Sequence, residues 1–258
     1  MLWENLTWPE IPAVLAQCGH AAILPVGATE QHGPHLGCGV DSVIAEQLCA
    51  AVAAKTGVPM LPVLPYGCSL GHSQRWPGTF ALQPVTLIQL VKELGDWAVH
   101  SGIRRLFIVN AHVTNAAPLR CALEMLRAEH DDLMVAVINT ATLSERVRQF
   151  HCADAADWHA NDAETSLMLA IAPEGVRPEK CAGADDPDRT CGCVFAHPVN
   201  RTSTNGVTGT PSLATVEKGA QWFDWLVDDL AELIRQGTRE TPPLPHSYSG
   251  DSVPATPS

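Results

Sequence analysis

Short apolar runs alternate along the chain with longer stretches in which apolar residues recur at helical spacing. Four runs predict buried strands, at residues 21–27, 58–63, 104–110 and 133–139. Five stretches predict helices, at residues 41–57, 85–101, 116–129, 163–172 and 213–236. Asp41 is expected to cap the first of these helices and Gly57 to end it.

This order of elements predicts the fold class. Strands that alternate with helices of ten or more residues are typical of βαβ units, which form a mainly parallel sheet. The strand runs are apolar throughout, so both faces of the sheet are expected to be covered by helices. We therefore predict an α/β fold with one domain over residues 1–237, an irregular connection at 173–198 and a disordered tail at 238–258.

Composition narrows the function classes. The 258 residues are 46% hydrophobic and only 17% charged, which excludes a disordered chain. A formal net charge of −12 argues against binding to nucleic acid or to anionic membranes. The chain shows no signal peptide or long apolar run, and its nine cysteines follow no disulfide framework, so we expect a cytoplasmic protein with free thiols. No nucleotide-binding glycine motif opens any of the predicted helices.

The first cluster of possible ligands follows the first predicted strand. Glu30, His32, His35 and Asp41 lie within twelve residues. Imidazole nitrogen and carboxylate oxygen are the groups that bind zinc and related metals. The alternative is that Glu30 is solvated, His35 is a loop histidine and Asp41 only caps the helix.

Two further clusters follow later elements. His112 comes just after the third predicted strand, where ligands of parallel sheets usually bind. Glu164 could complete a metal site, His159 could carry a proton, and Trp158 beside it is a candidate substrate contact. The alternatives are a polar strand end at His112, and at Glu164 a helix N-terminus whose acids favour the helix dipole.

The loop at residues 67–80 is rich in glycine and polar groups. Ser69, His72 and Trp76 in it are candidate substrate contacts. An ordinary surface loop would explain the same composition.

Together these clusters resemble the creatininase family of metal-dependent amidohydrolases. The matching stretches occur in family order between about residues 20 and 220: LPVGATEQHGPHLGCGVDS, PYGCSLGHSQRWPGTFAL, VNAHVTN, HANDAETS and STNGVTGTPSLATVEKG. The resemblance implies a three-layer α/β/α sandwich and two divalent metal ions, zinc with manganese or iron. It also implies a small-molecule substrate and a homo-oligomer, often a hexamer.

The resemblance also implies roles for individual residues. Glu30, His32, Asp41 and His112 fall on the family's metal positions, with Asp41 as the bridge, and His159 falls on its proton-transfer histidine. Glu164 matches the acid of the family's E-T-S element. The creatinine-hydrolysing member carries a metal-binding Glu two residues after the third-strand histidine, where this chain has Thr114. Either Glu164 takes over the second metal, or that metal binds weakly.

The expected function is therefore hydrolysis of an amide or cyclic amide C–N bond by a metal-activated water. One alternative is hydrolysis of a C–C or C–O bond in a cyclic carbonyl compound at the same centre, since the family also contains an enzyme that opens a cyclic keto-sugar. The other is a metal-binding protein that has lost catalysis and acts as a pathway partner.

Overall fold

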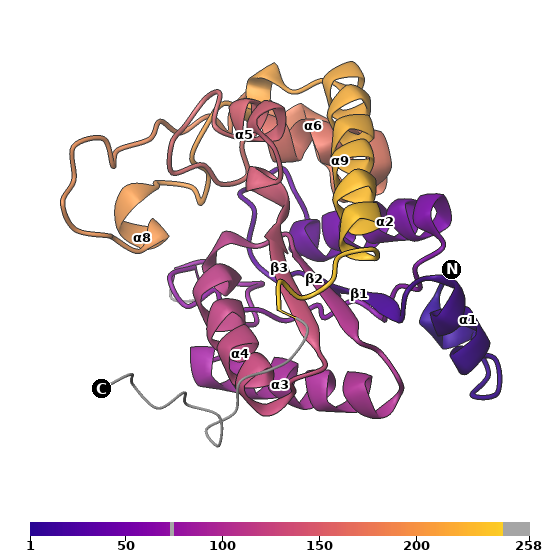
Figure 1. The fold of residues 1–258 in the computed structure, drawn as a ribbon. Coiled ribbons are helices and arrows are strands. Elements are labelled where there is room, and N and C mark those ends of the chain that lie inside the picture. The colour runs from indigo at the N-terminus through magenta and orange to yellow at the C-terminus, as the bar shows by residue number, and fades with distance from the viewer. Residues whose placement is uncertain (73–74, 245–258) are drawn as a thin grey trace, which may run out of the picture.

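The computed structural model describes residues 1–72 and 75–244. Its centre is a parallel sheet in the order β1–β2–β3, formed by β1 (Ala21–Val26), β2 (Arg105–Asn110) and β3 (Met134–Asn139). Helices cover both faces of this sheet (Figure 1), so the predicted three-layer α/β/α sandwich is confirmed. All six residues of β1 are buried, as its uninterrupted apolar sequence predicts for a central strand.

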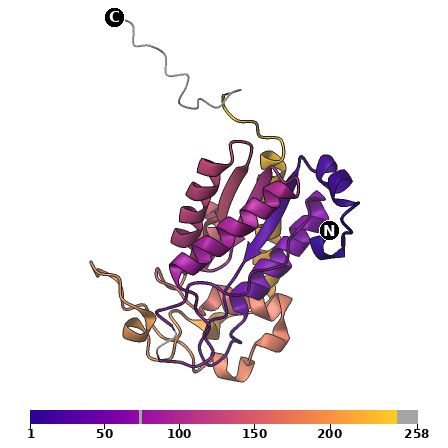
Figure 2. The same cartoon turned by 90° about the horizontal axis from the view of Figure 1, so that it is seen from below.

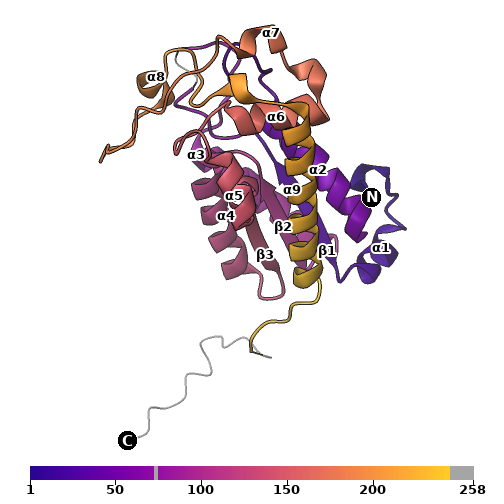
Figure 3. The ribbon, with the colours of Figure 1, turned by 90° about the horizontal axis from the view of Figure 1, so that it is seen from above.

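Two pairs of long helices form the outer layers. α2 (Val40–Thr56) and α9 (Val216–Gly237) pack together on one face, and α3 (Pro84–His100) and α4 (Ala116–Glu129) on the other (Figures 1 and 3). All four match helices predicted from apolar spacing. α2 ends where expected, because Gly57 adopts a left-handed conformation with φ of 77°.

The remaining helices are shorter. α6 (Asp162–Ile171) matches the fifth predicted stretch and packs against α9. The others were not predicted: η1 (Trp3–Asn5), α1 (Ile11–Gln17), η2 (Val113–Asn115), η3 (Thr140–Thr142), α5 (Glu145–His151), η4 (Pro173–Gly175), α7 (Pro178–Cys181), α8 (Val199–Thr202) and η5 (Pro211–Leu213). Among the described helices, none is both long and apolar enough to cross a membrane.

The strand predicted at residues 58–63 is wrong in detail. This segment runs parallel to β1 and exchanges isolated bridges with it, at Ile23–Met60 and Val26–Leu64, but it is not a continuous strand. Pro59 and Pro62 interrupt it. A proline has no N–H to donate to the ladder, so a segment with this proline spacing can pair only intermittently at the edge of a sheet.

The predicted cap of α2 is also wrong. The N-cap position is Gly39, which makes no side-chain hydrogen bond, and Asp41 lies inside the first turn. Its side chain is buried and turns toward His32 and His112. The carboxylate is therefore free to serve a site at the end of the sheet.

Residues 173–198 form the expected irregular connection, with only short helical turns. Figures 2 and 3 show this region and α8 gathered at the end of the sheet opposite to the one from which residues 238–244 leave. The rest of the predicted tail, residues 245–258, lies outside the described part of the chain.

A row of neighbouring rings joins α9 to the segment after α5. Trp222 stacks on Phe150 with ring centroids 4.6 Å apart, and the His151 ring lies 4.6 Å from Phe150 and 4.9 Å from Trp158. Both ring nitrogens of His151 are buried without a hydrogen-bond partner. Burial therefore lowers the pKa of His151 to about 3, and the ring is neutral at ordinary pH.

Acid should destabilise the protein through His151. The unfolded chain binds a proton at this residue below about pH 6.5, whereas the folded chain does so only near pH 3. Between these values the free energy of unfolding should fall by up to about 1.4 kcal/mol per pH unit from this residue alone. We expect His151→Leu to flatten the pH dependence of the urea midpoint from pH 6 to 4. An unchanged slope would contradict this account.

The crossing of α6 and α9 depends on Gly219. A Cβ atom at this position would lie 1.8 Å from the backbone oxygen of Ser166. We expect Gly219→Ala to lower the free energy of unfolding by about 1–3 kcal/mol, because the helices must move apart. Gly183→Ala is the matched control, since its Cβ would meet nothing closer than 4.0 Å. Equal urea midpoints for the two variants would refute the close approach.

Candidate metal centre

The predicted ligands meet beyond the carboxyl ends of β1 and β2. The register pairs Val26 with Asn110, so the loops that follow these two strands leave the sheet side by side. Asn115 joins these loops to a third: its amide donates to Gly27 O at 3.0 Å, and its Oδ1 accepts from the Cys68 N–H at 2.8 Å. This edge of a parallel sheet is where ligands of such folds bind.

Glu30, Asp41 and His112 form a first group whose ligand atoms all lie within 4.8 Å of one another. His112 Nδ1 is 3.3 Å from Asp41 Oδ2, and His112 Nε2 is 3.1 Å from Glu30 Oε2. The backbone oxygen of Cys68 lies 2.9 Å from Nε2 and can accept a hydrogen bond from an N–H there. That arrangement leaves Nδ1 as the nitrogen available to a metal.

His32 and Glu164 form a second group on the other side of Asp41. His32 Nε2 lies 3.5 Å from Asp41 Oδ1 and 3.7 Å from Glu164 Oε1. The other ring nitrogen, Nδ1, is 3.0 Å from the backbone oxygen of Glu30, an arrangement that fixes the ring of a metal-binding histidine. The two oxygens of Asp41 thus face different groups, as those of a bridging carboxylate do.

Several of these atoms are buried without a hydrogen bond. Both carboxylate oxygens of Glu30, Nε2 of His32 and Oδ2 of Asp41 make no hydrogen bond of regular geometry, and their near neighbours are charged or ionisable groups of the same cluster. Burial of unpartnered polar atoms is costly, and buried charges are normally paired or bound to a metal. Carboxylates and imidazoles are also the donor set that zinc and manganese prefer. The residues therefore fit divalent cations.

The charges of the group are strongly coupled. Burial alone would raise the pKa of Asp41, but His112 and His32 hold it at about 2. Burial would lower the pKa of His112, but Glu30 and Asp41 raise it to about 9, and Asp41 with Glu164 raises that of His32. Without a cation, protons on these imidazoles balance the carboxylates, and they must leave when a metal binds.

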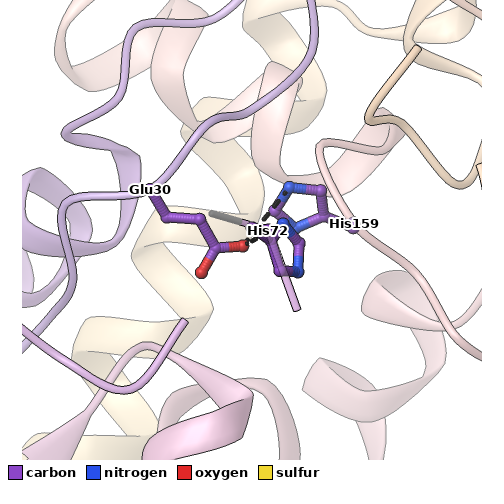
Figure 4. A group of neighbouring side chains, drawn as sticks. All are labelled: Glu30, His72 and His159. Carbon is purple, nitrogen blue, oxygen red and sulfur yellow. Dashed lines mark ion pairs between the residues drawn. The ribbon is translucent and has the colours of Figure 1, made fainter. Parts of the chain in front are cut away.

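His159 and His72 lie next to carboxylate oxygen Oε1 of Glu30 (Figure 4). His72 Nδ1 is 2.7 Å and His159 Nε2 3.5 Å from Glu30 Oε1. His159 Nε2 is also 2.8 Å from the backbone oxygen of Gln31. Burial and the neighbouring His32 and His72 lower the pKa of His159 well below its usual value. It is therefore neutral near pH 7, with Nε2 placed to donate to the Gln31 oxygen.

A tight turn sets the positions of His159 and Glu164. Ala160 between them adopts a left-handed conformation with φ of 51°, uncommon for a residue other than glycine. Its N–H donates to Glu164 Oε2 at 2.6 Å, and Asn161 caps α6 by accepting from the Glu164 N–H. His159 is held by a backbone bridge to Thr208. The turn brings both side chains to the same centre.

A cavity of about 500 Å³ opens onto these residues. Of the predicted substrate contacts, His72 and Trp158 line it. Ser69 and Trp76 do not: Ser69 is buried, with Oγ 3.2 Å from His112 Nε2, and Arg75 stacks on the Trp76 ring. Other lining residues were not predicted as substrate contacts and lie outside the strands and the long helices, among them Val113, Asp157, His197, Val199 and Thr208.

Comparisons with known proteins identify the family of the chain. The family model described as creatininase, creatinine amidohydrolase, matches residues 4–234. A creatinine amidohydrolase from Pseudomonas putida is 31% identical over 93% of this chain and 96% of its own length. A mycofactocin precursor peptide peptidase from Mycobacterium ulcerans is 32% identical over 90% of this chain and 87% of its own. A 3-dehydro-scyllo-inosose hydrolase from Thermotoga maritima is 25% identical over 90% and 82%.

Solved structures give the same result. A creatininase in its manganese form superposes with a TM-score of 0.81 at 28% identity, over 93% of this chain and 99% of the other. A mutant creatininase of the Zn–Zn type superposes with a TM-score of 0.80 at 30% identity, over 93% and 98%. Both share the fold over nearly the whole of each chain.

Proposed function

The chain belongs to the creatininase family of hydrolases, and on that premise we propose that it is a two-metal amidohydrolase that cleaves a C–N bond with an activated water. The observation that carries the proposal is the set of buried, unpartnered atoms of Glu30, His32 and Asp41 at one end of the cavity. We assign the whole activity to one domain, residues 1–237.

The two groups described above give the proposed ligands of each metal. Glu30, Asp41 and His112 would hold one ion, and His32, Asp41 and Glu164 the other. Asp41 would serve both. Structures of relatives in manganese and Zn–Zn forms support divalent ions of this kind, with zinc and manganese as the first candidates and iron as the third.

Glu164 is the proposed replacement for a carboxylate that this chain lacks after His112. Thr114 occupies that place and lines the cavity, but its hydroxyl cannot supply a negative charge. Glu164 Oε1 points at His32 Nε2, while its Oε2 is held by the Ala160 N–H. One oxygen thus orients the side chain, and the other is available to the second ion.

The bound ions would supply Lewis acidity, polarising a carbonyl oxygen and lowering the pKa of a water in the site. His159 is the proposed proton carrier. Neutral at pH 7 and beside Glu30, it can take a proton from the attacking water and pass it to the departing nitrogen. His72, which also contacts Glu30, would restrict the movement of that carboxylate.

A second candidate reaction uses the same centre. The relative named 3-dehydro-scyllo-inosose hydrolase acts on a cyclic carbonyl compound, and the cavity here presents the same kinds of metal-binding groups. We place it second because relatives of higher identity carry amide- or peptide-hydrolysing names. We also propose, on the family's behaviour, a homo-oligomer in the cytoplasm.

Metal content tests the ligand assignment. We expect about two equivalents of zinc or manganese per chain in the loaded protein, one in Glu164→Gln, and at most one in His112→Ala, since each change removes a ligand from one group. Glu174→Gln, an exposed carboxylate just past α6, is the matched control and should retain both. Two tightly held equivalents in Glu164→Gln would contradict the assignment.

His159 should matter for rate rather than for metal. In His159→Ala we expect both metals to remain and kcat on an amide that the wild type hydrolyses to fall by about 10²–10⁴-fold, the usual contribution of a proton-transfer residue. His100→Ala, on the exposed end of α3, controls for loss of a histidine. A His159 variant with full kcat would remove the residue from the mechanism.

A further inference from the structure

Asp157 stands apart from the other acidic residues of the cavity. Of the acids among the described lining residues, Glu30, Asp41 and Glu164 belong to the proposed metal groups, and Asp157 does not. It lies directly before Trp158, which lines the same wall. The residue is accessible, so its carboxylate can meet a ligand.

The Asp157 carboxylate has no partner of opposite permanent charge. Within residues 1–72 and 75–244, the Asp157 carboxylate makes no ion pair and no hydrogen bond. It is close enough to His72 and Asp188 to interact with them electrostatically. The neighbouring Asp188 is different. One of its oxygens accepts from the N–H groups of Ala156 and Asp157 at 3.1 Å, and the other is bound by Thr190. The carboxylate of Asp188 is thus hydrogen-bonded within its loop, whereas no described residue forms a hydrogen bond with the carboxylate of Asp157.

The described lining of the cavity brings no permanently charged side chain of opposite sign to Asp157. None of the described lining residues is a lysine or an arginine. Asp157 lines the cavity together with His72, which contacts Glu30. Glu30, whose carboxylate oxygens make no regular hydrogen bond, is fully buried and lines the same cavity.

Asp157 and Trp158 together present complementary chemistry for a cation. A carboxylate forms charge-assisted hydrogen bonds with an ammonium or guanidinium group, and an indole face attracts the same groups through its quadrupole. An anionic group in that position would instead meet an unbalanced negative charge.

We propose that Asp157 and Trp158 form the recognition end of the site and select substrates that carry an ammonium or guanidinium group a few bonds from the scissile carbonyl. This rests on the proposed metal centre, which would hold the carbonyl end. Asp157 sets specificity and takes no part in the cleavage step.

Hydroxamic acids allow a test that needs no turnover, because the hydroxamate group chelates metals and the tail can be varied. We would titrate the metal-loaded full-length protein by calorimetry with three matched series: ω-amino, n-alkyl and ω-carboxy hydroxamates with two to five methylenes. We expect the best ω-amino probe to bind about tenfold more tightly than the n-alkyl probe of equal length, and the ω-carboxy probe to bind most weakly.

Variants identify the residue responsible. Asp157→Asn should abolish the difference between ω-amino and n-alkyl probes, and Asp157→Glu should retain part of it at another tail length. Asp131→Asn, which removes the same charge from the turn before β3, should leave the difference intact.

The outcomes separate this inference from the proposed function. Chelation by all series with no preference for the amino tail, or a preference that survives Asp157→Asn, would overturn the role of Asp157 while the metal centre stands. Failure of every hydroxamate to bind the loaded protein would overturn the metal centre and the inference with it.

Discussion

The compensation of buried charge is the constraint on which this structure depends. Glu30 and Asp41 are buried at the end of the sheet, and the described residues lining the cavity include no lysine or arginine to neutralise them. Two carboxylates cannot remain charged in such a place without cations or protons. In the metal-free protein, protons on His112 and His32 balance the carboxylate charge, since the neighbouring carboxylates raise the pKa values of both histidines. Divalent ions would take the place of those protons when they bind.

The parallel sheet makes this concentration of charge possible. Its strands all end at one edge, so loops distant in sequence meet there, and each contributes only one or two polar side chains. Hydrogen bonds from the Asn115 amide, rather than from regular structure, hold these loops in register. The segment near Gly206 acts in the same way: its carbonyl accepts from Gln31, and a Cβ atom at Gly206 would lie 2.1 Å from the Gln31 side chain. The scaffold is thus rigid where the ligands are, although most of the site lies on loops.

The sequence was sufficient for the elements whose apolar spacing is regular. β1, β2, β3 and the four long helices follow from periodicity, because burial against a flat sheet imposes that spacing. Prediction from the sequence failed at residues 58–63, where the apolar composition suggested a strand but prolines interrupt the hydrogen-bond ladder. It also failed at Asp41, a residue suited to capping whose side chain lies among the candidate ligands instead. Asp157 and His197 escaped notice because their proximity to the cavity comes from irregular loops, whose paths no local pattern determines. The ligand types near strand ends could be identified, but their division between two groups on either side of Asp41 required coordinates.

Our assignment of Glu164 to the second ion has a structural consequence. Thr114 lies in a turn next to β2, whereas Glu164 lies in the first turn of α6, on the same short segment as His159. Four carboxylates line the cavity, and Glu30, Asp41 and Glu164 are the three that we assign to cations. Under this assignment the second ion and the proposed proton carrier would depend on one turn, with Ala160 left-handed at its centre and Asn161 as its cap. A displacement of that turn would move Glu164 and His159 together, whereas Thr114 brings only an uncharged group to the cavity. The proposed assignment therefore couples metal binding and proton transfer to the conformation of one short segment.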